Sequence, residues 1–384
     1  MTDPASSHAE SSGLRSLLRG LWLPLITPFC DGVVDEASLR RLVRHYAGLP
    51  IDGLILAATS GEGLTLGMAE LEWIVAVTRE TIGEGRRNLP ICLGLAGSHT
   101  RKMCHTLDET AGWPIDGYLI SSPYYSRPSQ RGLVQHFTTL AGHASRPVVL
   151  YNIPYRTGVT LETETLLELA GHPNIAGMKD CGANRAQSID LLRRRPAGFR
   201  ILTGEDAEYF EALTDGADGA ILLSAHIETA AFAAVRTLLM EGKTAAGRAR
   251  WESLSDLTRL LFAEPSPAPA KYWLSRTGLI DSAEVRLPMV EVSSELAARL
   301  DAEMARRDGH VPDSAMSSTT PSRPRARWVQ WLVTWPNHLV AHWQRRETTK
   351  TLQALNDHQL RDIGIRRDQI ETAVRGSVPP DVTV

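Results

Sequence analysis

Short apolar runs alternate with amphipathic stretches along most of this chain. Beginning at Leu21, eight such runs occur, at residues 21–27, 53–59, 90–96, 117–122, 147–152, 175–179, 200–204 and 219–224. Continuous apolar runs are typical of strands that are buried on both faces. The stretches between them repeat apolar residues at helical spacing, as in residues 35–49, which open with the acidic cap Asp35. The pattern predicts eight strand-then-helix units. Eight units favour an α/β fold of the (β/α)8 TIM-barrel type over an open sheet.

The end of the chain has a different pattern. Helical segments predicted at 226–241, 244–262, 268–278 and 293–306 indicate a small C-terminal helical bundle, so the barrel domain spans residues 13–305. Residues 1–12, rich in Ser and Ala, are expected to be disordered. Residues 306–327, rich in Ser, Pro and Arg, indicate a linker. Beyond the linker, a short all-α module rich in Trp and Arg is predicted at 328–376, with a tail at 377–384.

Composition and charge exclude several classes of protein. The chain has 43% hydrophobic and 22% charged residues and a net charge of −3, so it has no overall electrostatic bias toward nucleic acid or membrane. Its four cysteines lie far apart, which favours free thiols in a reducing compartment. Pro24 and Pro28 interrupt the one stretch that resembles a signal peptide, and no apolar run reaches membrane-spanning length. We therefore expect a cytoplasmic protein.

The predicted strand ends carry a distinctive set of side chains. In a (β/α)8 barrel the active site forms at these ends. The strand at 175–179 ends in Lys179, where burial favours an unprotonated, nucleophilic amine. The other groups are hydroxyls, phenols and a guanidinium: Thr59, Ser60, Tyr124, Tyr125, Tyr151 and Arg156. The set lacks metal-ligand spacing, a phosphate-binding glycine loop and a Ser-His-Asp arrangement. It suits carbonyl chemistry through a Schiff base.

Four motifs carry a family resemblance. "ATSGEG" (58–63), "SPYYSRPSQRGLVQHF" (122–137), "LYNIPYRTG" (150–158) and "GMKD" (177–180) resemble the signatures of the dihydrodipicolinate synthase and N-acetylneuraminate lyase superfamily, over residues 21–305. The "YNIPYRTG" motif is similar to that of the synthase branch. The resemblance implies a lyase that condenses pyruvate with L-aspartate semialdehyde to 4-hydroxy-tetrahydrodipicolinate, in lysine and diaminopimelate biosynthesis. It also implies no metal and no organic cofactor, and a homodimer or homotetramer.

The resemblance assigns roles to individual residues. Lys179 forms the imine with pyruvate. Proton transfer falls to a relay of three hydroxyl groups, those of Tyr151, Thr59 and Tyr125. Tyr125 is expected to reach in from a neighbouring subunit or to lie at the dimer contact with Tyr124. Substrate binding is assigned to Thr59 and Ser60 through backbone N–H groups, to Arg156 for the second carboxylate, and to the pocket-lining Gly158 and Ile221.

Other polar residues near the strand ends favour structural interpretations. Glu62, Glu205 and Asp206 lie where carboxylates commonly stabilise helix N-termini, so we interpret them as helix caps. Cys181 follows the lysine by two residues and is interpreted as structural. A tyrosine at a strand end such as Tyr124 is more often a packed side chain than a catalytic one.

Two other functions stay open at this point. The segment "KDCGAN" (179–184) and the bulky Tyr155 depart from the synthase pattern. They leave room for another pyruvate-dependent aldolase or dehydratase that acts on a sugar acid or a hydroxyproline-derived keto acid. The second alternative is a non-catalytic scaffold for the C-terminal module, against which the intact lysine, tyrosine, threonine and arginine set argues.

Regulation by lysine is expected to be weak or absent. Feedback-controlled members of the superfamily bind lysine beside the first tyrosine of the "PYY" motif through polar and acidic side chains. At the corresponding positions this chain has Met68, Leu71, Ser98 and Lys102. The ammonium of Lys102 would repel that of the effector.

The C-terminal module resembles a second family. Residues 352–370, "LQALNDHQLRDIGIRRDQI", resemble the short arginine-rich YjiS-like domain. The preceding segment places four tryptophans near one helical face, with Pro336 as a kink. Packing within the protein is the simplest interpretation. Weak contact with a membrane surface or with RNA, through Arg345, Arg346, Arg366 and Arg367, is the alternative.

Overall fold

The computed structural model describes residues 13–85, 87–182 and 184–308. The chain divides into two compact units, Met1–Val311 and Pro312–Val384, and the described residues belong to the first. The predicted disordered N-terminus, the module at 328–376, the tail and most of the predicted linker lie outside the described residues. The described part of the linker range, residues 306–308, is the end of a helix.

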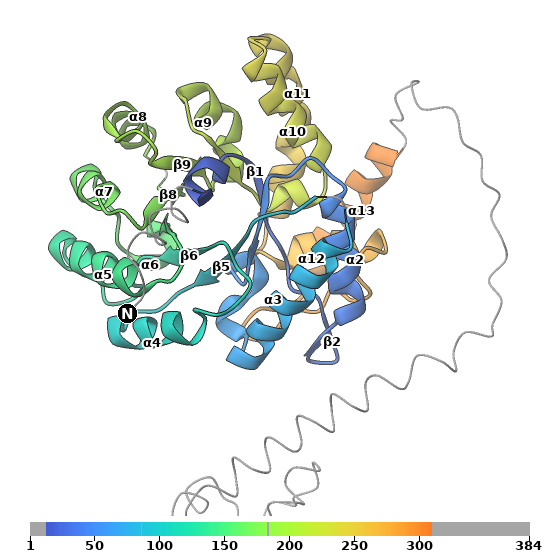
Figure 1. Cartoon of the computed structure of the whole chain (residues 1–384). Coiled ribbons are helices and arrows are strands. Elements are labelled where there is room, and N and C mark those ends of the chain that lie inside the picture. The colour runs from blue at the N-terminus through green and yellow to red at the C-terminus, as the bar shows by residue number, and fades with distance from the viewer. Residues whose placement is uncertain (1–12, 86, 183, 309–384) are drawn as a thin grey trace, which may run out of the picture. The chain divides into compact units, whose positions relative to one another are not determined.

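A closed barrel of parallel strands forms the centre of the first unit, as predicted (Figure 1). Going around the barrel, the strands follow the order β1-β10-β9-β8-β7-β6-β5-β4. Each predicted apolar run overlaps one barrel strand. These strands are β1 (Gly20–Pro24), β4 (Gly53–Leu56), β5 (Ile91–Leu95), β6 (Gly117–Ser121), β7 (Val148–Asn152), β8 (Ile175–Asp180), β9 (Arg200–Thr203) and β10 (Gly219–Ile221).

Helices surround the barrel, and one small antiparallel sheet lies outside it. That sheet pairs β2 (Phe29–Cys30) with β3 (Val33–Val34) and was not predicted from the sequence. The helices that follow barrel strands are α2 (Glu36–Ala47), α3 (Met68–Gly83), α4 (Thr100–Glu109), α5 (Gln130–His143), α6 (Pro154–Thr157), α7 (Thr163–Ala170), α8 (Arg185–Arg194), α9 (Tyr209–Asp215) and α10 (Thr229–Met240). Short 3-10 turns are η1 (Thr59–Gly61), η2 (Gly63–Thr65), η3 (Asp206–Glu208) and η4 (Ser224–His226).

Two hydrophobic cores hold this architecture together. The larger lies between the strands and the surrounding helices, and the smaller fills the barrel interior with side chains such as Trp22, Leu119 and Ile221. Leu14 and Leu18, from the N-terminal segment, belong to the interior core. A side chain at Gly117, the first residue of β6, would meet Leu14 at 2.5 Å. The N-terminal segment therefore closes the end of the barrel at which the strands begin.

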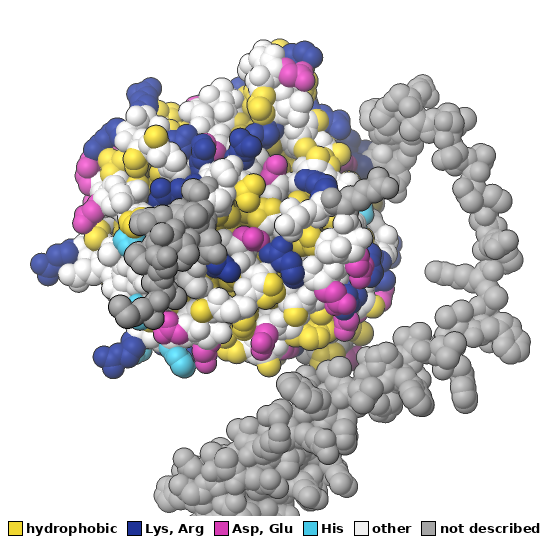
Figure 2. Space-filling view, in the orientation of Figure 1, with side chains coloured by type: hydrophobic (Ala, Val, Ile, Leu, Met, Phe, Trp, Pro, Cys, Tyr) yellow, Lys and Arg dark blue, Asp and Glu magenta, His cyan; other side chains and the backbone are white. Residues whose placement is uncertain are grey.

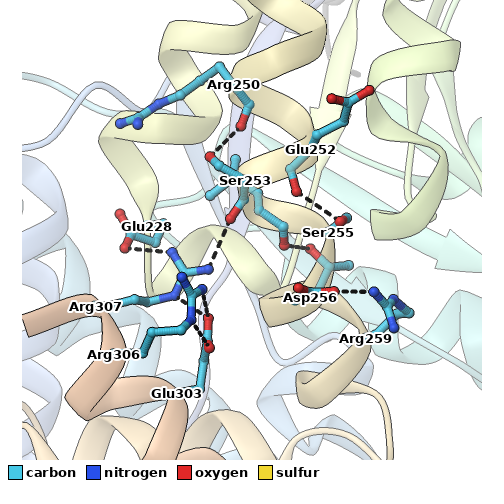
Figure 3. A network of polar contacts seen from close by, with 12 residues as sticks. Glu228, Arg250, Glu252, Ser253, Ser255, Asp256, Arg259, Glu303, Arg306 and Arg307 are labelled. Carbon is cyan, nitrogen blue, oxygen red and sulfur yellow. Dashed lines mark hydrogen bonds and ion pairs between the residues drawn. The ribbon is translucent and has the colours of Figure 1, made fainter. Parts of the chain in front are cut away.

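The predicted C-terminal helices are present as α11 (Thr244–Leu261), α12 (Ala268–Arg276) and α13 (Ser294–Asp308). Arg307 on α13 donates to Glu228 at 3.1 Å and to the Ser253 carbonyl at 3.1 Å, and it also pairs with Glu303 (Figure 3). Tyr272 on α12 donates to the Asp301 carboxylate of α13 at 3.1 Å. These contacts attach the C-terminal helices to the barrel and to one another.

The described surface mixes both signs of charge. On the face drawn in Figure 2, Lys and Arg side chains are interspersed with Asp and Glu side chains. Within the described residues, no helix is both long enough and apolar enough to cross a membrane.

Candidate active site

Lys179 lies inside the barrel, directly beside Tyr151. The two residues are register partners on neighbouring strands β8 and β7, which places both side chains on the same face of the sheet. The Lys179 Nζ lies 4.5 Å from the centre of the Tyr151 ring, and the two residues are only 5% and 6% exposed. A barely hydrated amine thus stands against an aromatic face at the carboxyl end of the strands.

The Tyr151 phenol is a neutral donor and acceptor. Burial raises its pKa well above the usual value, and a side-chain hydrogen bond with Thr59 opposes that shift only in part. A phenol that keeps its proton can pass it on and take it back, which is the requirement for a proton-transfer group beside an amine. The sequence paired Tyr151 with Thr59, and the structure brings them together.

Gly204 makes room for the lysine. A Cβ at this position, just after β9, would lie 2.1 Å from Lys179 Cε and 2.6 Å from Cys181 Sγ. The Lys179 side chain therefore lies between the Tyr151 ring and the backbone of Gly204, which has no side chain. Gly204 was not predicted as a site residue, because nothing in "RILTG" indicates which side chain from another strand approaches it.

Cys181, which we interpreted from the sequence as a structural residue, contacts the residues of the candidate site. The thiol is 1% exposed, forms a side-chain hydrogen bond with Tyr151, and lies close enough to Lys179 to feel its charge. Burial raises the pKa of the thiol to about 12, and the nearby lysine opposes the shift. Cys181 is therefore a neutral packing partner of the phenol.

A tight turn follows β4 where the sequence predicted carboxylate-binding N–H groups. Thr59, Ser60 and Gly61 form the 3-10 turn η1, and the first N–H groups of such a turn have no acceptor within it. The chain reaches this turn through Ala57 at a left-handed φ of 55°. Gly63 then passes so close to the Ala57 carbonyl that a Cβ there would lie 1.9 Å from the oxygen. The turn is fixed by backbone packing on both sides.

The helix-cap interpretation of Glu62 is wrong. Glu62 makes no side-chain cap to the turn that follows it. Its carboxylate instead forms a buried ion pair with Lys271 on α12, a residue that the sequence analysis did not select. The sequence around Lys271 does not indicate that this lysine is buried. A buried lysine in an amphipathic helix has the same sequence pattern as a solvated one, and the two can be distinguished only when the residue that pairs with the lysine is known.

The interpretation of Glu205 and Asp206 as caps of their own helix is also wrong. Glu205 precedes η3 without a side-chain cap, and burial raises the pKa of its carboxyl. Asp206 is 2% exposed and accepts the backbone N–H of Ser224 at 2.6 Å, so it supports η4, a turn on the next unit of the barrel. Burial raises its pKa, and the Ser224 hydrogen bond opposes that shift.

Arg156 is exposed and lies in a short helix at the carboxyl end of β7. It belongs to the short helix α6 directly after β7, and its guanidinium lies 5.6 Å from the Tyr155 ring. Asn152 braces the loop by donating to Asp180 at 3.0 Å and accepting from the Leu161 N–H at 3.1 Å. The guanidinium therefore stands at the barrel mouth on a supported backbone.

The remaining predicted residues divide between the interior and the surface. Ile221 on β10 is fully buried in the interior core, and Gly158 ends α6 with a left-handed φ of 76°. Tyr125 is 96% exposed and Tyr124 is 37% exposed. Within this single chain, Tyr125 therefore does not enter the buried cluster of Thr59, Tyr151 and Lys179.

Ser121 is a polar group of the interior that the sequence analysis did not select. It is the register partner of Tyr151, so its side chain faces the same interior side of the barrel wall. The residue is 8% exposed, and its hydroxyl has no hydrogen-bond partner among the described residues. A buried hydroxyl without a partner indicates space for a ligand group or for water.

The arrangement as a whole supports imine chemistry. A buried amine, a neutral phenol, a hydroxyl and a turn with free N–H groups converge at one end of the barrel, and a guanidinium stands at the mouth. Among the described residues, no group of three His, Cys, Asp or Glu side chains is placed to hold a metal ion.

Comparison with known proteins agrees with the site. A model of the dihydrodipicolinate synthetase family matches residues 17–306, and a model of the YjiS-like domain matches residues 337–371. The chain is 40% identical over 284 residues to 4-hydroxy-tetrahydrodipicolinate synthase 2 of Clostridium acetobutylicum, covering 74% of this chain and 98% of that protein. It is 40% identical over 280 residues to a 4-hydroxy-tetrahydrodipicolinate synthase of Streptococcus mutans, covering 72% and 93%.

Solved structures give the same result. The 4-hydroxy-tetrahydrodipicolinate synthase of Methylacidiphilum fumariolicum superimposes with a TM-score of 0.72 at 32% identity, covering 76% of this chain and 96% of that one. A dihydrodipicolinate synthase of Acinetobacter baumannii, solved with pyruvate, gives a TM-score of 0.71 at 29% identity, covering 75% and 98%.

Proposed function

The chain belongs to the dihydrodipicolinate synthetase family, and on this premise we propose that it condenses pyruvate with L-aspartate semialdehyde to 4-hydroxy-tetrahydrodipicolinate. The observation that carries the proposal is the buried Lys179 amine, held 4.5 Å from the Tyr151 ring at the active end of the barrel. The relatives named as synthases match this chain over nearly their whole length. The product belongs to lysine and diaminopimelate biosynthesis.

The reaction begins with an imine. The Lys179 amine attacks the keto carbon of pyruvate, a C–N bond forms, and the carbonyl oxygen leaves as water. Loss of a methyl proton turns the imine into an enamine, whose carbon attacks the aldehyde carbon of the second substrate and forms the new C–C bond. The amino group of that substrate then attacks the imine carbon, which closes the ring, breaks the C–N bond to Lys179 and frees the lysine amine. Because the protonated imine itself accepts the electron pair, this scheme requires neither a metal nor an organic cofactor. Activity that survives dialysis against a chelator is the expected result.

The neighbouring residues take roles that fit their positions. Tyr151 and Thr59 move protons to and from the substrate through their hydrogen-bonded hydroxyls. The N–H groups of Thr59 and Ser60 hold the pyruvate carboxylate. Arg156 binds the carboxylate of the aldehyde as a bidentate donor.

Two further pocket residues and one exposed tyrosine complete the proposal. Gly158 and Ile221 line the pocket. Tyr125 completes the relay from a second copy of the chain, since its 96% exposure leaves it free to reach a neighbour. The active form is then a homodimer or homotetramer in the cytoplasm. An active Tyr125→Phe variant with the kcat of the parent chain would contradict the role assigned to Tyr125.

Turnover of pyruvate with L-aspartate semialdehyde, coupled to a reductase that consumes the product, tests the function. The parent chain should turn over, and Lys179→Ala should lose activity, while borohydride should trap pyruvate on Lys179 of the parent chain alone. Trapping without turnover would discard the aldehyde and direct attention to sugar acids and hydroxyproline-derived keto acids. Trapping at another lysine would overturn the assignment of Lys179.

The C-terminal module adds a separate proposal. We infer a weak contact of the module at 328–376, which includes the YjiS-like region, with an anionic surface, either a membrane or RNA, from the arginines and tryptophans of the module. The full chain and a chain that ends at residue 311 can be compared for binding to anionic vesicles and to RNA. Salt-sensitive binding by the full chain alone supports the proposal. Equal behaviour of the two chains contradicts it.

A further inference from the structure

A buried ion pair joins the carboxylate-binding turn to the C-terminal helices. Glu62 follows η1 directly, whereas Lys271 lies more than two hundred residues later, on α12. Their side chains are 2% and 0% exposed. The Lys271 ammonium donates to one oxygen of the Glu62 carboxylate and, at 2.8 Å, to the Glu284 carbonyl. The other Glu62 oxygen accepts the Arg286 backbone N–H at 2.9 Å.

The surroundings of this pair keep water out. The Lys271 Nζ lies 4.2 Å from the centre of the fully buried Phe29 ring, and the Arg286 guanidinium lies 4.3 Å from the same ring. Arg286 is itself paired with Glu70 on α3. Burying two opposite charges is costly, and hydrophobic replacement is often no worse for stability. A contribution to the stability of the fold is therefore a weak explanation for the presence of this ion pair.

The pair acts on a strained segment of the active site. Glu62 has a left-handed φ of 53°, which is uncommon for a residue other than glycine and persists only where the surroundings impose it. Its N–H donates to the Thr59 carbonyl at 3.1 Å, so the backbone of Glu62 closes η1. Moving the Glu62 side chain would therefore move the turn that presents the Thr59 and Ser60 N–H groups.

We infer that Glu62 and Lys271 are positioning residues that hold the η1 turn in the geometry required by the carboxylate of the keto-acid substrate. This inference rests on the proposed function in one respect, the binding of pyruvate by η1. It gives the C-terminal helices a role in the site, because α12 supplies the anchor for a turn on the second barrel unit. Neither residue touches the reacting atoms.

Pyruvate trapping with borohydride tests the inference without any aldehyde. Glu62→Gln keeps the shape of the side chain and removes its charge. Burial already lowers the pKa of Lys271 to about 8, with the Glu62 carboxylate opposing that shift, so in this variant Lys271 can lose its proton and leave no unpaired charge. We expect the pyruvate concentration for half-maximal trapping to rise about ten- to a hundredfold, the loss associated with a charge-assisted hydrogen bond. The rate at saturating pyruvate should change much less.

A matched control separates positioning from loss of stability. Arg307→Met breaks the contacts that attach α13 to Glu228 and Ser253, but it leaves η1 untouched. This variant should melt at a lower temperature than the parent chain and trap pyruvate at the concentrations that the parent requires. Glu62→Gln should show the opposite behaviour. The pyruvate concentration for half-maximal trapping should rise strongly, whereas the melting temperature should change only modestly.

A double variant keeps the test decisive if a single change prevents folding. Glu62→Gln combined with Lys271→Met removes both charges, so no buried charge is left unpaired, and folding should recover. The weakened response to pyruvate should remain, because the neutral pair no longer fixes the turn. A folded single or double variant that traps pyruvate at parental concentrations would overturn the inference. A parent chain that traps pyruvate but rejects the aldehyde would refute only the proposed substrate.

Discussion

Replacing Gly204 by alanine should disable Lys179 without unfolding the barrel. The added Cβ would lie 2.1 Å from Lys179 Cε and 2.6 Å from Cys181 Sγ, whereas ordinary carbon contacts begin near 3.4 Å. Relief therefore requires a movement of more than about 1 Å. The lysine has little room to move, because the Tyr151 ring lies against its other side.

The expected magnitude follows from this displacement. Overpacking a core by one methyl costs roughly 1–3 kcal/mol, which a barrel with so large a core can absorb. A nucleophile misplaced by about 1 Å loses on the order of a hundredfold in rate. We therefore expect Gly204→Ala to fold, to melt somewhat below the parent chain, and to form the imine about a hundredfold more slowly.

The assay is the rate of borohydride trapping of pyruvate, followed by mass spectrometry of the intact chain. Gly142→Ala is the matched control, since a Cβ at this position in α5 meets no atom within 4 Å. The control should trap pyruvate at the parental rate. If Gly204→Ala also does so, the lysine does not run along this glycine, and the path assigned to its side chain between Gly204 and Tyr151 is wrong.

Three further outcomes are expected. Burial lowers the pKa of His226 to about 4, and its ring accepts the Ile26 N–H, so only the unfolded chain binds a proton as the pH falls from 6.5 to 4. Over that window stability should fall by roughly 3 kcal/mol, and His226→Gln should flatten this slope in denaturant titrations; parallel slopes would refute the assignment. Ser121→Ala should raise the free energy of unfolding by about 1 kcal/mol, because it removes an unpartnered buried hydroxyl, and should raise a substrate KM severalfold. A less stable variant with unchanged KM would make the hydroxyl structural. L-Lysine should leave the turnover rate unchanged in titrations, since Lys102 occupies the expected effector position, and inhibition at low concentration would contradict this.

Some residues of the candidate site could be predicted from the ends of the apolar runs and from the sequence motifs. Lys179 and Tyr151 could be chosen because each ends an apolar run, and parallel strands in a barrel bring such ends together. Gly204, Ser121 and Lys271 could not be chosen in this way. A glycine, a serine and a lysine are common in any chain, and their importance depends on which group from a distant segment faces them.

The sequence alone determined the eight-stranded barrel and which residues lie at the carboxyl ends of its strands. Eight buried strands require eight continuous apolar runs, and this requirement is visible as local pattern, as are the helices between them. The tertiary structure alone decided the partners of the charged groups. Glu62 has the local pattern of a helix cap but pairs with Lys271, because α12 carries an ammonium to a water-free space beside Phe29. Local hydrophobic pattern reports burial of apolar surface, whereas the pairing of buried charges is a long-range interaction that depends on the folded path of the chain.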